Sequence, residues 1–362
     1  MFLARIISAC FAFAALIYGL SLTAPTSPHV PRYPQDSHTN RPTRYPPAPV
    51  AVNISELHIA GTYVRAIDGT EFVFQKPLRP SLGTVLFLHG CAHSATDFFP
   101  SGSNCPQCIG LPEELKMTRI ALEKRYTVVA VSSTDRIRKC WRTDTQTFDG
   151  PDYERVNKAL REAAVRSLYS PRLPLFAVGI SSGGLFATSL PMRLRVSGVN
   201  SIVSGAVSSV WNKESPLRKD YPPHVFTHMG LKDKHTAERV RKAMDILETM
   251  GTPSMELIVP PQSVTTHFLQ DSVSKWDMSN AQELVLALQR GGYLDAHFHL
   301  LSDPRRSQWR NSVQHLGTKL GDHFRPDESA LSEELNRAWG SHEITADHFE
   351  EALEFLETQL HR

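Results

Sequence analysis

The sequence predicts an α/β fold, in which helices cover both faces of a mostly parallel sheet and a helical insertion precedes the last helix. Three observations predict it. The apolar segments at residues 57–65 and 71–75 are joined by a tight turn, as in an antiparallel hairpin. After them, short apolar runs of the buried-strand type alternate with segments of helical periodicity. Residues 265–340 then show helical patterns and loops without a clear strand.

The hairpin is predicted at residues 57–65 and 71–75, which flank the turn dipeptide Asp68-Gly69. The later strands are expected to be buried on both faces, because their runs are almost continuously apolar. They lie at residues 84–89, 127–132, 173–179, 199–206, 224–229 and 255–259.

Amphipathic helices are predicted where apolar residues recur three and four positions apart. These helices lie at residues 113–124, 153–168, 236–250 and 346–360. The last is expected to bury a stripe formed by Phe349, Leu353, Leu356 and Leu360.

The first 51 residues differ in character from the rest. Residues 6–22 are almost wholly apolar and follow Arg5, which predicts an uncleaved signal anchor at residues 1–24. A cleaved signal peptide, and thus a secreted protein, is the main alternative, and a buried helix the other. Residues 25–51 are rich in proline and are predicted to form an extended stalk. The body of the protein, from residue 52 to 362, is then expected on the luminal or extracellular side of a membrane.

Two further features agree with a secretory location. Asn53-Ile-Ser55 is a glycosylation sequon. The four cysteines at 91, 105, 108 and 140 predict two disulfides in an oxidising compartment, and three pairings are possible. A zinc site built from Cys91, His93, Cys105 and Cys108 and a redox role for Cys105 and Cys108 are the weaker alternatives.

Composition excludes one class of partner. The chain is 362 residues long, 41% hydrophobic and 21% charged, with a formal charge of +2. It has no basic excess, so a nucleic-acid partner is not expected.

The strongest motif is Gly179-Ile-Ser181-Ser-Gly183, which stands between a predicted buried strand and a helix of small residues. A serine turned sharply between strand and helix needs small neighbours two positions away on each side. Its hydroxyl is then exposed at a helix N-terminus, where the helix dipole favours developing negative charge. Ser181 is therefore the predicted nucleophile.

This motif in its context resembles the α/β-hydrolase superfamily, and the resemblance covers the sheet from about residue 57 to the final helix. The strand that ends at His89-Gly90 is similar to the strand of that family that leads to the oxyanion hole. The resemblance implies that the backbone amides of Cys91 and Ser182 are the two oxyanion donors. The segment from residue 105 to 114 further resembles a little-studied plant and algal branch of these hydrolases.

Chain order in this fold runs from the serine to an acid and then to a histidine. The acid is predicted to be Asp233, in the loop after the strand at residues 224–229. A helix N-cap is the alternative role for Asp233, and Asp220 and Glu214 are weaker candidates for the acid.

The base is predicted to be His342, which directly precedes the terminal helix, with Thr345 as the expected cap of that helix. His267, a few residues beyond the last strand, remains an alternative. His297 and His299 are spaced as two metal ligands can be, but alternating histidines without further ligands are more often structural, and no metal is predicted.

These residues predict a serine hydrolase that cleaves a carboxylic ester or a related acyl bond through an acyl-enzyme, without a cofactor. A small-molecule or lipid-like acyl substrate is expected, under an insertion whose Phe268, Trp276 and Trp309 shape an apolar pocket. A peptidase or acyltransferase with the same triad is one alternative, and an inactive, membrane-tethered binding module is another. The oligomeric state is left open.

Overall fold

The computed structural model describes residues 57–144, 147–205, 218–272, 277–316 and 329–361. The predicted signal anchor, the stalk, the sequon at Asn53, the candidate acid Glu214 and the pocket residue Trp276 all lie outside these ranges. Within them, no helix combines the length and the apolar character that crossing a bilayer requires.

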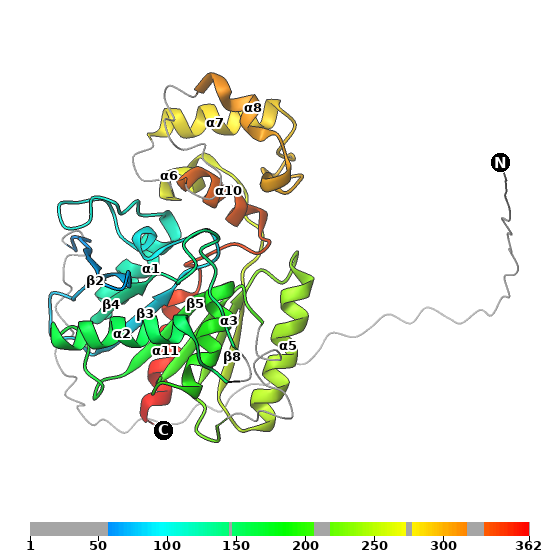
Figure 1. Ribbon diagram of the computed structural model, residues 1–362. Coiled ribbons are helices and arrows are strands. Elements are labelled where there is room, and N and C mark those ends of the chain that lie inside the picture. Colours follow the sequence, from blue (N-terminus) through cyan, green and yellow to red (C-terminus); the bar gives the residue numbers. More distant parts are fainter. Residues whose placement is uncertain (1–56, 145–146, 206–217, 273–276, 317–328, 362) are drawn as a thin grey trace, which may run out of the picture. The chain divides into compact units, whose positions relative to one another are not determined.

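Eight strands form one sheet (Figure 1). They are β1 Thr62–Arg65, β2 Glu71–Gln75, β3 Gly83–Leu88, β4 Tyr126–Val131, β5 Leu175–Ile180, β6 Gly198–Ile202, β7 His224–His228 and β8 Ser254–Ile258. The spatial order is β1-β2-β4-β3-β5-β6-β7-β8. Strand β2 pairs antiparallel with β1 and β4, and every other neighbouring pair is parallel. The predicted fold class, a mostly parallel sheet that begins with a hairpin, is confirmed.

The helices of the described chain are α1 Pro112–Glu123, α2 Pro151–Val165, α3 Ser182–Ser189, α5 Lys234–Thr249, α6 Thr266–Ser272, α7 Met278–Arg290, α8 Trp309–Val313, α10 Ala330–Trp339 and α11 Phe349–Thr358. Short 3-10 turns are η2 Ala95–Phe98, η3 Leu190–Met192, η4 Pro304–Arg306, η5 Gln314–Leu316 and η7 Gln359–His361.

Each face of the sheet carries its own apolar layer, because successive strand side chains point to opposite faces. Helices α1 and α11 pack on one face, where Phe87, Val128 and Phe176 lie. Helices α2, α3 and α5 pack on the other face. The helices between residues 264 and 338 form a third apolar cluster around Leu284 and Trp309.

Two strands are several residues shorter than predicted. The segment before Thr62 leaves the ladder because the side chain of Gln75 bonds the backbone of His58 and Ala60 there. Strand β6 ends at Ile202 because Val203 has a φ of +45°, which a strand cannot continue.

The terminal helix also begins later than expected. Helix α11 starts at Phe349 with His348 as its cap, so the prediction that Thr345 caps it was wrong. Residues 345–347 form a turn instead, in which the Asp347 amide donates to Thr345 Oγ1 and the Ala346 amide donates to the buried Glu113. Leu360 lies beyond the helix and is 37% exposed, so only the first three residues of the predicted stripe are buried.

The four cysteines form two disulfides, Cys91–Cys140 and Cys105–Cys108. This pairing excludes the alternative zinc site, because a disulfide sulfur is no longer a thiolate ligand. Disulfides are typical of domains that are secreted or face the outside of the cell.

Candidate active site

Ser181 occupies the turn between β5 and α3, in a backbone conformation that serine rarely adopts. Its φ is +50° and its ψ is −111°, at the cap position of α3. A side chain on Gly183 would collide with the carbonyl oxygens of Leu88 and His89, and one on Gly179 would collide with the Gly183 backbone. The two small neighbours of the motif therefore let the turn pack against β3.

Ser181 meets a histidine and a carboxylate from distant parts of the chain. Ser181 Oγ lies 3.0 Å from His342 Nε2, and His342 Nδ1 lies 2.9 Å from Asp233 Oδ2. The His342 side chain is 47% exposed, whereas that of Asp233 is 12% exposed. An imidazole held by a carboxylate and in contact with a hydroxyl can accept the hydroxyl proton as the oxygen attacks.

Asp233 contacts His342 and also caps a helix. It caps α5, because the Thr236 amide donates to Oδ1 at 3.0 Å. Thr236 Oγ1 donates to Oδ2 at 2.6 Å, beside the His342 contact. Burial raises the pKa of Asp233, but the hydrogen bonds with His342 and Thr236 outweigh it and hold the pKa well below the ordinary value. The carboxylate is therefore charged and oriented at neutral pH.

The loop that carries His342 is held from the helical insertion. His342 has a φ of +50°. Arg305, in η4, donates to the carbonyl oxygens of both Ser341 and His342, and Asp303 fixes its guanidinium from the other side. The insertion thus holds the backbone from which His342 projects.

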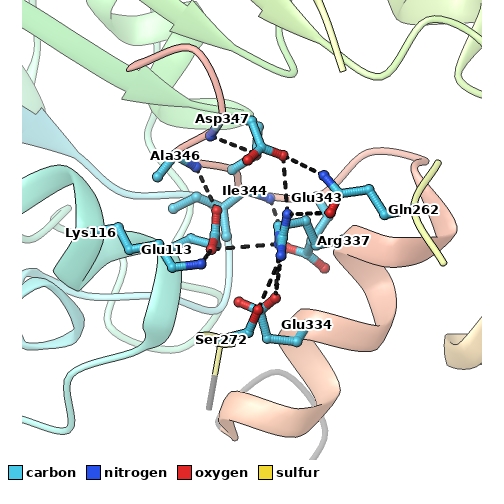
Figure 2. A network of polar contacts seen from close by, with 11 residues as sticks. Glu113, Lys116, Gln262, Ser272, Glu334, Arg337, Glu343, Ile344, Ala346 and Asp347 are labelled. Atoms are coloured by element: carbon cyan, nitrogen blue, oxygen red, sulfur yellow. Dashed lines mark hydrogen bonds and ion pairs between the residues drawn. The ribbon is translucent and has the colours of Figure 1, made fainter. Parts of the chain in front are cut away.

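A buried charged network holds the chain immediately after His342 (Figure 2). Arg337 of α10 contacts Glu334 at 2.8 Å and Asp347 at 3.0 Å, and it lies 3.5 Å from Glu113 of α1. Glu113 in turn accepts from the Ala346 amide at 2.6 Å. Burial and the neighbouring Glu113 raise the pKa of Glu334 to about 8, while Arg337 opposes the rise. The network joins α1, α10 and the turn that follows His342.

The two predicted oxyanion amides follow the paired strands β5 and β3. At the first position of α3, the Ser182 amide has no partner within the helix. Cys91 is exposed and follows β3, and its disulfide joins this loop to Cys140. The neighbouring His89 is buried, with Nδ1 2.6 Å from the Gly90 carbonyl oxygen, and Nε2 accepts from the Ser133 amide. Burial lowers the pKa of His89 to about 4, so the ring is neutral and holds the loop in place.

A cavity of about 280 Å³ opens beside the serine. Its lining combines Ser181, Asp233 and His342 with the apolar Leu185 and Val203. Trp309 does not shape this cavity. It is 1% exposed inside the cluster of the insertion, so the prediction that it shapes the pocket was wrong. Phe268 packs against the same cluster.

The other candidates are not brought to Ser181. His267 lies on the exposed side of α6. Asp220 pairs with Arg218. His299 contacts Ser263 and Asp295 in a loop of the insertion.

Sequence reasoning missed two residues that support this site. Thr236 stands three positions after Asp233, a spacing that could have indicated the capping contact. Arg305 is separated from His342 by 37 positions, and nothing in its neighbourhood indicated a contact.

The sequence matches no protein-family model and no curated protein. Among solved structures, the chain is similar to an acylaminoacyl peptidase of Pyrococcus horikoshii, with 15% identity and a TM-score of 0.39 over 57% of this chain and 37% of that one. It thus spans little more than a third of that peptidase. The plant and algal resemblance finds no support in these comparisons.

Two other similar structures are matched over most of their length. One is a thermostable carboxyl esterase from Bacillus coagulans, with 13% identity and a TM-score of 0.38 over 56% of this chain and 90% of that one. The other is MGS-M1, an alpha/beta hydrolase enzyme from a Medee basin deep-sea metagenome library, with 14% identity and a TM-score of 0.40 over 64% and 96%. Each of these three proteins is a hydrolytic enzyme.

Proposed function

We propose that this protein is a serine hydrolase that cleaves a carboxylic ester through an acyl-enzyme. The contacts of His342 carry the proposal, because its two ring nitrogens lie 3.0 Å from Ser181 Oγ and 2.9 Å from Asp233 Oδ2. A serine hydroxyl is a poor nucleophile unless such a base removes its proton.

In the proposed reaction, Ser181 Oγ attacks the acyl carbonyl carbon while its proton passes to His342 Nε2. Asp233 accepts a hydrogen bond from Nδ1–H and stabilises the imidazolium that forms. The amides of Cys91 and Ser182 bind the developing oxyanion, and removal of one such donor typically costs about 2.7–4 kcal/mol. His342 then protonates the leaving alcohol, and a water activated by His342 releases the acid.

A small acyl substrate suits the cavity of about 280 Å³, which combines apolar Leu185 and Val203 with polar Ser204, His235 and Arg239. We expect the leaving group to be an alcohol and not an amine, because the sequence predicts an esterase more than a peptidase. The two disulfides favour an activity located outside the cytosol, in the secretory pathway or beyond.

The test is covalent labelling of the full chain, produced in an oxidising host, with a fluorophosphonate probe and in parallel with a p-nitrophenyl ester assay. Labelling and ester hydrolysis are expected for the wild type, with both lost in Ser181→Ala. His342→Ala should reduce both by several orders of magnitude.

His267→Ala is the matched control, because it removes an exposed histidine from α6. It should label and hydrolyse like the wild type. A folded wild type that reacts with neither probe nor ester would contradict the proposal and favour a binding role. A label that persists in Ser181→Ala would place the nucleophile elsewhere.

A further inference from the structure

Buried polar atoms without a hydrogen-bond partner gather behind the loop that carries Cys91. Among the described residues, neither carboxylate oxygen of Glu114 or of Glu333 has a partner in hydrogen-bond geometry, and His93 Nδ1 meets only the carboxylates of Asp97 and Glu114. The Glu114 side chain is 0% exposed, and Glu333 is 3% exposed. Buried polar atoms are almost always paired in folded proteins, so unpaired ones gathered in one place indicate a missing ligand.

The spacing of these atoms suits a metal ion. His93 Nδ1 lies 3.3 Å from Asp97 Oδ2 and 3.2 Å from Glu114 Oε1. All three donor atoms lie within 4.8 Å of one another. Around a tetrahedral Zn²⁺ with bonds of about 2.0–2.1 Å, donor atoms lie about 3.3–3.4 Å apart. The carboxylate of Glu333 adjoins that of Glu114, outside this group of three atoms, and a turn of its side chain would supply a fourth donor.

Four separate segments contribute these side chains, and the surrounding structure orients them. His93 follows β3, Asp97 is in η2, Glu114 is in the first turn of α1, and Glu333 is in the first turn of α10. The Asp97 carboxylate is oriented by the Ser94 amide, which donates to Oδ2 at 2.9 Å, and by the Thr96 hydroxyl, which donates to Oδ1 at 3.1 Å. Oriented carboxylates of this kind are typical of metal sites.

We propose that His93, Asp97, Glu114 and Glu333 bind one divalent transition-metal ion, and that this ion is Zn²⁺. One imidazole nitrogen with carboxylate oxygens is a donor set that Zn²⁺ accepts. Ca²⁺ requires six to eight oxygen ligands, and Mg²⁺ keeps several waters in an octahedral shell. A dication also offsets three buried carboxylates, whose burial without a compensating charge is costly.

The ion connects the helical insertion to the loop of Cys91. Glu333 belongs to α10 of the insertion, whereas the His93 amide donates to the Gly90 carbonyl oxygen at 3.3 Å. Cys91, the residue after Gly90, is the proposed oxyanion donor. The site therefore stabilises the junction between insertion and core, and it takes no part in the bond-breaking steps.

The test is metal binding by the full chain with any affinity tag removed. Elemental analysis should find about one zinc per purified chain, and a chelator should remove it and lower the melting temperature. Adding Zn²⁺ back to the metal-free chain should restore the zinc content and the melting temperature, and calorimetric titration should measure the affinity of this binding. Glu114→Gln and Glu333→Gln, which keep the shape and remove the charge, should each weaken Zn²⁺ binding by about 100-fold or more.

Glu256→Gln is the matched control. Glu256 Oε1 lies 2.8 Å from His228 Nε2, so this variant breaks a histidine–carboxylate pair outside the proposed site. It should bind Zn²⁺ like the wild type. The proposal is overturned if the wild-type chain takes up no Zn²⁺, or if Glu114→Gln and Glu333→Gln bind it with unchanged affinity. If one of the two variants does not fold, the other decides between these results.

Discussion

Replacement of Arg337 by methionine should destabilise the protein strongly, because Arg337 and Lys116 are the cations drawn beside the acidic side chains of this network (Figure 2). The Arg337 side chain is 4% exposed. It contacts Glu334 at 2.8 Å, Asp347 at 3.0 Å and Glu113 at 3.5 Å. Methionine has a similar length but no charge, so the change tests charge and hydrogen bonding more than volume.

At pH 9, where Glu334 is ionised in the wild type, the expected loss is about 3–5 kcal/mol of unfolding free energy, the usual cost of leaving a buried charge without its partner. Lys116 remains 2.6 Å from Glu113 and limits the loss at that carboxylate. Glu334 is left without its cation and becomes harder to ionise. The loss should therefore be smaller at pH 5, where Glu334 is protonated in both variants, than at pH 9.

The assay is urea unfolding at pH 9 and at pH 5, followed by circular dichroism. With a slope of about 3 kcal/mol per molar urea, the midpoint at pH 9 should fall by about 1–1.7 M. Arg161→Met is the control, because Arg161 is an exposed arginine on α2, and it should change the midpoint little. Adding Glu334→Gln to Arg337→Met should recover part of the loss. A midpoint equal to that of the control would refute the view that this network stabilises the fold.

Two further results are expected. Arg305→Met should slow fluorophosphonate labelling about tenfold, because the two hydrogen bonds that hold the Ser341 and His342 carbonyls are lost, and about 1.4 kcal/mol of barrier is a factor of ten in rate. Arg306→Met, at the exposed neighbouring position, should label at the wild-type rate. Equal labelling rates for the two variants would exclude a role of Arg305 in positioning His342. His224→Gln should make stability less sensitive to acid, because burial lowers the pKa of His224 to about 3 in the folded chain, and the stability due to the neutral ring is lost as pH falls below about 6.5. Between pH 7 and pH 5 the wild type should lose about 2 kcal/mol more than the variant in urea unfolding, and parallel pH curves would contradict this.

Much of the fold could be predicted because its signals are local. Apolar runs and helical periodicity located all eight strands and the helices α1, α2, α5 and α11 to within a few residues. The errors fall where a distant contact overrides the local pattern. Strand β1 is shortened by the side chain of Gln75, and the start of α11 is delayed by the bond from Ala346 to Glu113, 233 positions away.

The candidate site divides in the same way. The turn at Ser181 is written into five consecutive residues, because strand, glycine and helix requirements all act within that turn. Asp233 could be placed by its position after β7, since the carboxyl ends of parallel strands meet at one edge of a sheet. The disulfide pairing could not be chosen, because three pairings were equally compatible with the spacing.

By itself, the sequence determined the sheet, its hairpin and the strained serine turn, because backbone geometry and burial act over a few neighbouring residues. Only the tertiary structure decided which histidine lies beside Ser181, since 161 positions separate it from His342. The same holds for Arg305, for the Arg337 network and for the cluster of His93, Asp97, Glu114 and Glu333. Their contacts depend on how the insertion folds back onto the core, and no local pattern encodes that distance.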